Sequence, residues 1–386
     1  MARGGIDLKQ SPTDKESLKL HRDSFVADLH CDTVLRLVDG VDLSVRGEKG
    51  HIDLPRLKEG GVGLQVMACW LDTDTPRERC RPRVDRLLDA LDELTTRESD
   101  RVARCTTAAQ AREIHSQGRI ALLYGIENGV AIAGDLNNLD HFYERGVRCM
   151  TLTHMASSDW CESSSDAPSP FNGLTDFGRD VVRRMNELGM MVDVSHASPR
   201  AVEEVLEVST DPIIASHSCV HALCAHDRNL TDDQIRAIAD CDGMIGVNFF
   251  TGFLSDQIRV LLEEYHAAHR EELDAIAARF AGDPDGREAA EKPFRVAFEK
   301  EAAARTHVDL ALLCDHIEYI ARLIGPEHVG LGSDFDGMSL VPDGLDDCSM
   351  LPNITVELMQ RGFGAADVKM VLGENFLRVF AQVCDR

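Results

Sequence analysis

A chain of 386 residues is long enough for two ordinary domains or for one large α/β barrel. Hydrophobic residues make up 44% of the sequence and charged residues 28%, which favours a folded protein with a substantial core over a disordered one. The 41 basic and 66 acidic side chains give a formal net charge of -25. Such a surface should repel nucleic acids and anionic membranes, and we exclude both as main partners.

Residues 1–20 are polar and lack the apolar stretch beside basic residues that marks a secretory signal. No apolar run approaches the length of a membrane span, so we expect a soluble, cytoplasmic protein. The 12 cysteines are irregularly spaced and include no Cys-x-x-Cys pair, which argues against a zinc ribbon or a thioredoxin-type motif. We expect most of them to be reduced and to pack as small hydrophobic residues.

Short apolar runs recur along the chain and are mostly separated by helical patterns. In chain order, the runs typical of strands lie at 25–29, 62–68, 120–126, 147–152, 190–195, 212–216, 243–249 and 328–333. A short helix or turn is expected at 52–57, and helices at about 83–97, 107–116, 139–145, 176–188, from Pro199, from Thr231, up to Ile324, at 354–361 and at 375–383.

About eight strands, nearly all separated by helices, imply parallel strands that close into a (β/α)8 TIM barrel. A doubly wound open sheet is the alternative, but no Gly-x-Gly-x-x-Gly follows the first strand. Residues 256–306, rich in Ala, Glu and Arg, interrupt the alternation before the last barrel strand. We interpret them as a helical insertion into a single barrel domain spanning 1–386, and leave open whether it is a solvated excursion, a lid or an oligomer contact.

Residue types that bind metals follow several of these apolar runs. His30 and Asp32 alternate after the first run, so both side chains can reach one point and hold one cation. The corresponding places after later runs are taken by Glu127, His154, His196, His217 and Asp334. Because the active site of such a barrel lies at the carboxyl ends of its strands, we expect these seven side chains to converge.

Three or four imidazoles and two or three carboxylates are too many for one tetrahedral ion. They suit two ions about 3.5–4 Å apart that share a carboxylate and a water. Glu127 is the bridge we expect, with a helix-capping role beside Asn128 and Gly129 as the alternative. Five other histidines fall within helical patterns and are expected on solvent-exposed faces of those helices: His115, His141, His266, His269 and His316.

Six motifs, in order along nearly the whole chain, resemble those of the renal (membrane) dipeptidase family, a branch of the amidohydrolase superfamily. They are Asp28-Leu29-His30-Cys31-Asp32, Gly125-Ile126-Glu127-Asn128-Gly129, Leu152-Thr153-His154, Asp193-Val194-Ser195-His196, Ser216-His217-Ser218 and Gly332-Ser333-Asp334-Phe335-Asp336-Gly337. The mammalian members are secreted and lipid-anchored, whereas residues 1–20 of this sequence do not have the pattern of a secretory signal. The insertion at 256–306 looks like that of bacterial relatives.

The resemblance implies a metal-dependent dipeptidase with two Zn2+ per chain, in which a metal-bridging hydroxide attacks the peptide bond of a dipeptide. His30 and Asp32 would hold one zinc, His196 and His217 the other, with Glu127 between them. His154 would polarise the scissile carbonyl, Arg228 would grip the substrate carboxylate, and Asp334 would pass a proton to the leaving amine. These last three residues would therefore contact the substrate.

Other functions fit the same residues. A related amidohydrolase could act on N-acyl amino acids or on another small amide or lactam, and a non-enzymatic protein could use the barrel to bind a metal or a peptide. Manganese and cobalt suit the same ligand types as zinc. Family habit also leaves a homodimer open as the assembly.

Overall fold

The computed structural model describes residues 14–166, 168–338 and 340–385. Nine parallel strands form one sheet. They are β1 (Val26–Asp28), β2 (Val62–Trp70), β3 (Val102–Cys105), β4 (Ile120–Glu127), β5 (Val147–Thr151), β6 (Met191–Asp193), β7 (Ile214–Ala215), β8 (Met244–Val247) and β9 (Val329–Leu331).

Eight of these strands close into a ring in the order β1, β2, β4, β5, β6, β7, β8, β9. The ring closes because β4 pairs with β2 along one whole edge, from Leu64 opposite Ala121 to Trp70 opposite Glu127. The predicted (β/α)8 barrel and its eight predicted strands are therefore confirmed. Their parallel direction gathers the carboxyl ends of all eight strands at one mouth of the barrel.

The ninth strand, β3, was missed by the sequence patterns. It pairs only with the amino-terminal half of β4, below the point where β5 takes over the same edge. Its four residues include the exposed Arg104 and the half-buried Ala103, so it has no continuous apolar run. A strand that lies outside the ring, with only its first and last residues buried, lacks the continuous apolar pattern by which the other eight are recognised.

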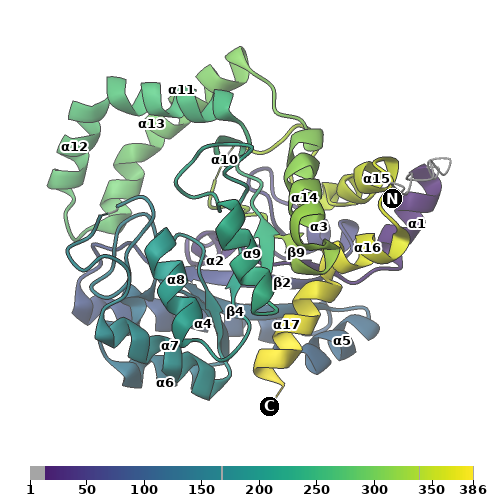
Figure 1. Ribbon diagram of the computed structural model, residues 1–386, viewed down its shortest axis with the longest axis horizontal. Helices are drawn as coiled ribbons and strands as arrows, with labels where there is room; N and C mark the ends of the chain where they lie inside the picture. Colours follow the sequence, from purple (N-terminus) through teal and green to yellow (C-terminus); the bar gives the residue numbers. More distant parts are fainter. Residues whose placement is uncertain (1–13, 167, 339, 386) are drawn as a thin grey trace, which may run out of the picture.

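Helices connect the strands and surround the barrel (Figure 1). They are α1 (Asp14–Arg22), α2 (Thr33–Val38), α3 (Leu54–Glu59), α4 (Arg77–Arg97), α5 (Ala108–Ser116), α6 (Leu136–Glu144), α7 (Asp176–Leu188), α8 (Pro199–Val208), α9 (Asp232–Asp240), α10 (Thr251–Leu254), α11 (Asp256–Ala268), α12 (Arg270–Arg279), α13 (Pro284–Arg305), α14 (Leu310–Ile324), α15 (Pro352–Gln360), α16 (Ala365–Lys369) and α17 (Asn375–Cys384). Short turns complete the set: η1 (Gly129–Ile132), η2 (Pro326–His328), η3 (Cys348–Met350) and η4 (Met370–Glu374).

The segment between β8 and β9 contains the three helices α11, α12 and α13, which stand away from the barrel in Figure 1. The helical insertion before the last barrel strand is thus confirmed. Arg287 of α13 reaches Asp74, in the loop after β2, with its Nη1 3.4 Å from a carboxylate oxygen. The grouping of all residues into one domain stays a prediction.

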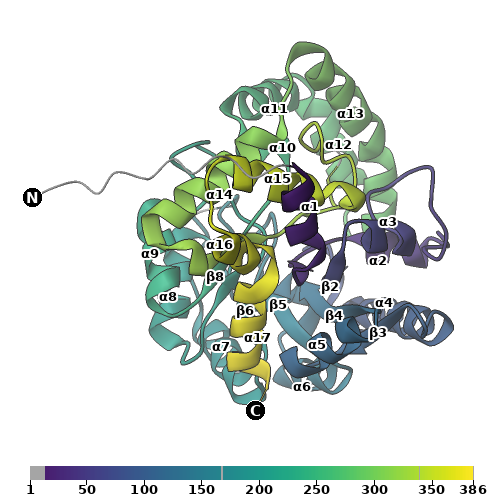
Figure 2. The same ribbon diagram turned by 90° about the vertical axis from the view of Figure 1, so that its right-hand side faces the viewer.

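The barrel interior is packed with side chains and is not a pore. Alternate residues of the strands point inward, among them Leu64 and Val66 of β2 and Ala121 and Leu123 of β4. The same apolar cluster includes Phe376 and Phe380 of α17, which covers the amino ends of the strands (Figure 2). The opposite, carboxyl end is therefore the one left for a polar site.

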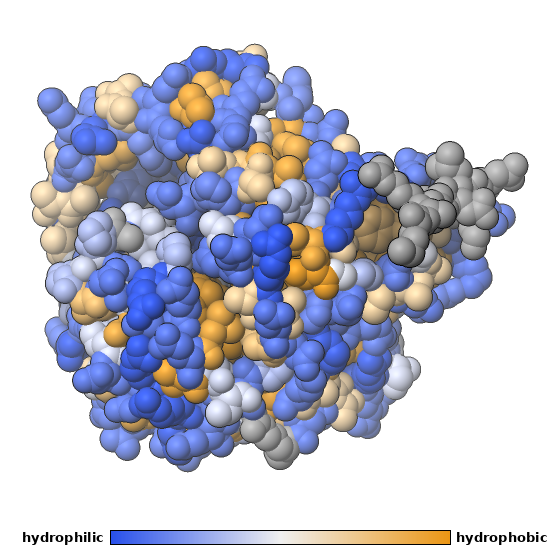
Figure 3. Space-filling view, viewed as in Figure 1, coloured by the Kyte–Doolittle hydropathy of each residue, from blue (hydrophilic) through white to orange (hydrophobic). Residues whose placement is uncertain are grey.

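The surface is predominantly hydrophilic in the view of Figure 3, with apolar side chains scattered over it. No disulfide joins the cysteines, and eleven of the twelve are buried. Burial raises the pKa of the Cys80 thiol to about 11. The cysteines thus pack as small hydrophobic residues, as predicted. No helix among residues 14–166, 168–338 and 340–385 is long and apolar enough to span a bilayer.

The prediction for His316 was wrong. This side chain is fully buried in α14, where Nδ1 accepts the Val220 amide at 3.0 Å and Nε2 lies 3.2 Å from the Leu254 carbonyl oxygen. Burial lowers its pKa to about 4, so the imidazole is held neutral. The helical spacing could not show which face of α14 packs against the loops after β7 and β8.

Candidate active site

Each of the seven predicted side chains stands at or just after the carboxyl end of a barrel strand. His30 and Asp32 follow β1, Glu127 ends β4, and the other four follow β5, β6, β7 and β9. They form three overlapping groups whose ligand atoms lie within 4.8 Å of one another: His30, Glu127 and His217; Glu127, His154 and His196; and His30, Asp32 and Asp334. Parallel strands bring residues that are up to 304 positions apart (334 − 30) into one cluster.

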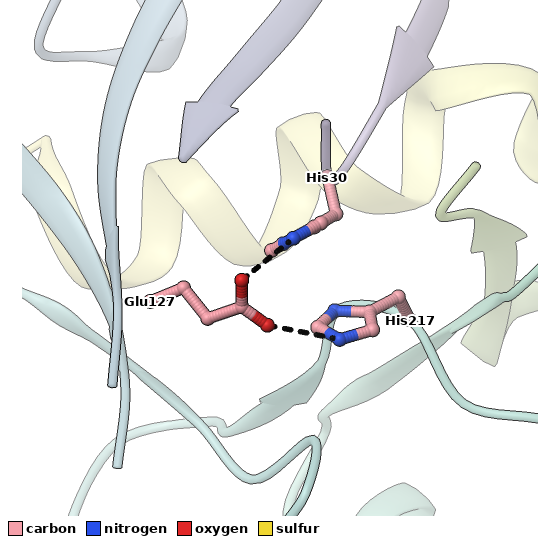
Figure 4. Close-up of side chains that lie close together, drawn as sticks. All are labelled: His30, Glu127 and His217. Atoms are coloured by element: carbon pink, nitrogen blue, oxygen red, sulfur yellow. Dashed lines mark ion pairs between the residues drawn. The ribbon is translucent and has the colours of Figure 1, made fainter. Parts of the chain in front are cut away.

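Glu127 is the centre of the cluster. Its Oε2 lies 3.4 Å from His30 Nε2, while its Oε1 lies 3.1 Å from His196 Nε2 and 3.4 Å from His217 Nε2. Figure 4 shows the carboxylate between the rings of His30 and His217, with one oxygen directed to each. The two oxygens of Glu127 therefore face two different halves of the cluster, His30 on one side and His196 with His217 on the other.

The ligand atoms of the cluster are buried and poorly satisfied by protein hydrogen bonds. His30 and Glu127 are 2% and 3% exposed. Among the described residues, His30 Nε2 and Asp32 Oδ1 have no hydrogen-bond partner, and His196 Nε2 and His217 Nε2 face each other at 2.9 Å. Buried polar atoms are normally paired. Imidazole nitrogens and carboxylate oxygens left in this state fit divalent cations, which these residue types bind.

Ionisation in the cluster is strongly perturbed. Burial, followed by the negative charge of Glu127, raises the pKa of Asp32 to about 7. Burial opposes ionisation of Glu127 as well, but the surrounding histidines, His30 first, bring the pKa of this carboxyl well below its usual range. Burial also lowers the pKa values of His154 and His217. Burial opposes protonation of His30 too, but the negative charge of Glu127 brings the pKa of this imidazole well above its usual range. A cation bound between these groups would displace that proton.

The turn that carries Asp334 has an unusual backbone. Asp334 and Asp336 have φ values of 60° and 68°, a left-handed conformation that non-glycine residues seldom adopt. The Asp336 carboxylate anchors the turn by accepting hydrogen bonds from Thr33 Oγ1 at 2.7 Å and Arg36 Nη1 at 2.8 Å. A Cβ at Gly337 would overlap the Asp32 carboxylate, so only glycine lets the turn approach the site this closely.

Asn248 contacts the site and was missed at the sequence level. Its Nδ2 donates to Asp334 Oδ2 at 2.9 Å, which fixes the orientation of that carboxylate. Asn248 follows β8 directly, in the same position that the predicted ligands occupy after their own strands. Applying the strand-end rule to amides as well as to metal-binding side chains could have found it.

Arg228 reaches the cluster from the loop after β7. It is 3% exposed, its Nη2 donates to the His217 carbonyl oxygen at 3.2 Å, and its guanidinium lies 5.4 Å from the Phe253 ring centroid. Among the described residues its Nε has no hydrogen-bond partner. Burial lowers the pKa of Arg228 to about 10. A buried guanidinium in this state is prepared to bind an anion.

The sequence profile of the membrane dipeptidase family, peptidase family M19, matches residues 15–385. The chain belongs to this family.

Individual relatives agree with that membership. The dipeptidase aclJ of Aspergillus oryzae (strain ATCC 42149 / RIB 40) is 31% identical over 344 residues, which cover 86% of this chain and 70% of the relative. The crystal structure of the probable dipeptidase PvdM from Pseudomonas aeruginosa aligns with a TM-score of 0.80 at 27% identity, over 96% of this chain and 98% of that one.

A metallo peptidase from Rhodobacter sphaeroides, solved with a phosphinate mimic of the dipeptide L-Ala-D-Ala, aligns with a TM-score of 0.75 at 25% identity. The alignment covers 94% of this chain and 100% of that one. The predicted family and the predicted enzyme class, a metal-dependent dipeptidase, are thus confirmed. The family implies a metal cofactor for this member of it, and the histidine and carboxylate groups described above could hold one.

Proposed function

We propose that this family member hydrolyses the peptide bond of dipeptides with two zinc ions per chain. The observation that carries the proposal is the position of Glu127, whose two oxygens face His30 on one side and His196 and His217 on the other. His30 and Asp32 would hold one zinc, His196 and His217 the second, and Glu127 would bridge them. When bound, the zinc pair supplies Lewis acidity, which lets a water act as a nucleophile near neutral pH.

His154 is assigned to the substrate carbonyl. Its side chain is 23% exposed, against 3% for His30 and 1% for His217, so it lies on the accessible side of the cluster. Burial favours its neutral form, which has one N–H to donate. This N–H would donate to the carbonyl oxygen as negative charge develops there. The hydrogen bond would stabilise the transition state by about 3 kcal/mol.

Asp334 is assigned to proton transfer. Because Asn248 donates to Oδ2, the Asp334 Oδ1 atom remains to accept a proton from the attacking water and to deliver it to the leaving amine. The anchored left-handed turn described above keeps this carboxylate beside His30 and Asp32. Proton transfer by a positioned group typically contributes a factor of about 100 to 10,000 in rate.

Arg228 is assigned to the carboxylate of the substrate. The buried guanidinium makes no ion pair with a described carboxylate within 4.0 Å, so a substrate carboxylate would supply the missing charge. An N-acyl amino acid has the same carboxylate but no free amine, which is why the related amidohydrolase activity is tested beside the peptidase activity. The cytoplasmic location and the homodimer stay predictions.

The test is a substrate panel with the zinc-loaded protein. Dipeptides should be hydrolysed and N-acetylated amino acids should react much more slowly. Rapid cleavage of acylated amino acids without turnover of any dipeptide would favour the related amidohydrolase instead. Bound zinc with no turnover of any substrate would favour a binding protein.

A further inference from the structure

A buried carboxylate outside the proposed ligand set lies beneath the half of the site that contains His196 and His217. Asp193, the last residue of β6, is 1% exposed. Its Oδ1 accepts the backbone amides of Ser195 at 3.0 Å and Ser216 at 2.9 Å. Its Oδ2 accepts the hydroxyls of Thr151 and Ser216, both at 2.5 Å. Every polar group that contacts this carboxylate is a donor, so Asp193 acts purely as an acceptor.

The Ser216 hydroxyl connects Asp193 to His217. Ser216 Oγ lies 2.5 Å from Asp193 Oδ2 and 2.7 Å from His217 Nδ1. A hydroxyl has a single proton, and a carboxylate oxygen at 2.5 Å would repel the hydroxyl oxygen unless that proton lay between them. The proton therefore points to Asp193, and Ser216 Oγ offers only lone pairs to the ring. His217 Nδ1 must then be the nitrogen that donates.

This hydrogen-bond direction also determines whether the other ring nitrogen, Nε2, has a hydrogen. A neutral imidazole has one N–H, and the contacts of Ser216 Oγ with Asp193 and with the ring place that hydrogen on Nδ1 of His217. With the proton on Nδ1, the Nε2 atom presents a lone pair, and Nε2 is the atom that lies 3.4 Å from Glu127 Oε1 and 2.9 Å from His196 Nε2. His196 differs, because its Nδ1 is buried without a partner among the described residues.

We propose that Asp193, acting through the Ser216 hydroxyl, holds His217 in the tautomer whose bare Nε2 faces Glu127, and so sets the cation affinity of this half of the site. The inference rests on the proposed function in assigning a cation there, and Asp193 and Ser216 are positioning residues that touch neither substrate nor cation. The same carboxylate also ties together the ends of β5, β6 and β7 through Thr151, Ser195 and Ser216. His154, His196 and His217 follow these strand ends, so their relative positions depend on it.

Ser216→Ala tests the inference, and Ser218→Ala is its matched control. Both serines are buried, but the Ser218 hydroxyl contacts Ser195 Oγ at 3.4 Å and not a ring nitrogen. The zinc dissociation constant of each full-length variant is measured by competition with a chelator. Loss of an outer partner of a metal-binding histidine usually lowers affinity about 10- to 100-fold, and we expect this for Ser216→Ala. Ser218→Ala should stay within about twofold of the parent, and Ser216→Thr, which keeps a hydroxyl, should restore most of the loss.

A second readout does not depend on zinc. Nitrogen-15 NMR of the histidine-labelled, metal-free protein reports which ring nitrogen of His217 has the proton, with the signal assigned from its loss in His217→Asn. The parent and Ser218→Ala should show Nδ1–H, and Ser216→Ala should show a mixture. Asp193→Asn replaces one carboxylate oxygen by an NH2 group, which then faces two of the four donors. It should therefore weaken zinc binding, and adding Ser216→Ala to it should change affinity little further. If Asp193→Asn does not fold, the serine variants still decide the question.

Two results separate this inference from the proposed function. Parent-like zinc affinity and an unchanged tautomer in Ser216→Ala would overturn the relay and leave the zinc dipeptidase proposal standing. A parent protein that binds no zinc would overturn the proposed function, while the NMR tautomers would still test the hydrogen-bond relay.

Discussion

Replacement of Arg228 by methionine should separate substrate recognition from folding. The guanidinium is buried, its Nε has no partner among the described residues, and burial lowers its pKa to about 10. At about 1.4 kcal/mol per pKa unit, keeping this charge in the folded protein costs roughly 3 kcal/mol. Arg228→Met should therefore leave the free energy of unfolding at or above the parental value, despite the loss of the hydrogen bond to the His217 carbonyl oxygen.

Catalysis should change in the opposite direction. Removing one partner of a buried charge pair costs about 2–5 kcal/mol, and a loss of about 3 kcal/mol corresponds to a fall of roughly 100-fold in kcat/KM. The assay compares a dipeptide with its carboxyl-terminal amide, which lacks the charge that Arg228 would bind. The parent should prefer the dipeptide by roughly 100-fold, and Arg228→Met should turn over the two substrates at nearly equal, low rates.

Arg56→Met is the matched control. Arg56 is also buried, but it pairs with Asp53 and, at 2.9 Å, with Asp347. Its removal should lower the free energy of unfolding, because two carboxylates lose their partner, and should leave the substrate preference unchanged. Equal zinc content in all proteins excludes an indirect effect through His217. If Arg228→Met kept its preference for the dipeptide over the amide, Arg228 would not bind the carboxylate.

Three further changes test other parts of the site and of the fold. Asp334→Asn should lower kcat by about 100-fold or more without loss of zinc, and unchanged kcat would exclude Asp334 from proton transfer. Glu127→Gln should reduce the zinc content on metal analysis, because the bridge loses its charge, and a parental content would contradict the bridging role. His316→Gln concerns stability: the folded-state pKa of about 4 lies below the unfolded value of 6.5, so the unfolded chain binds more protons between these pH values. The stability contributed by neutral His316 is thus complete above pH 6.5 and falls by about 3 kcal/mol as the pH drops through 4. Denaturant unfolding at several pH values should show a flatter pH dependence for His316→Gln, and an unchanged slope would refute this role.

The barrel could be predicted from the sequence because the eight strands that form it are buried on both faces. Runs such as Ile120–Ile126 are continuously apolar, and a ligand-type side chain follows several of them. The strand-end rule then predicted the convergence of His30, Glu127 and His217, since parallel strands must end at one mouth. The short, half-exposed strand β3 has neither property, and it was missed for that reason.

The buried polar residues around the proposed ligands could not be predicted from the sequence in the same way. Asp193 and Ser216 lie 23 residues apart, and their contact depends on the register and twist of β6 and β7. The burial of His316 depends on which face of α14 packs against the loops beside it. Neighbouring residues in the sequence predict which side chains end a strand, whereas such contacts between elements require the assembled fold.

A zinc titration of the metal-free protein tests the central claim most directly. Dipeptide hydrolysis should be absent after chelation and should rise with added zinc until about two equivalents are bound per chain. Metal analysis of the reconstituted protein should give the same ratio. Full hydrolysis in the chelated protein, or full activity at a single equivalent of zinc, would contradict a site built on Glu127 as the bridge between two ions.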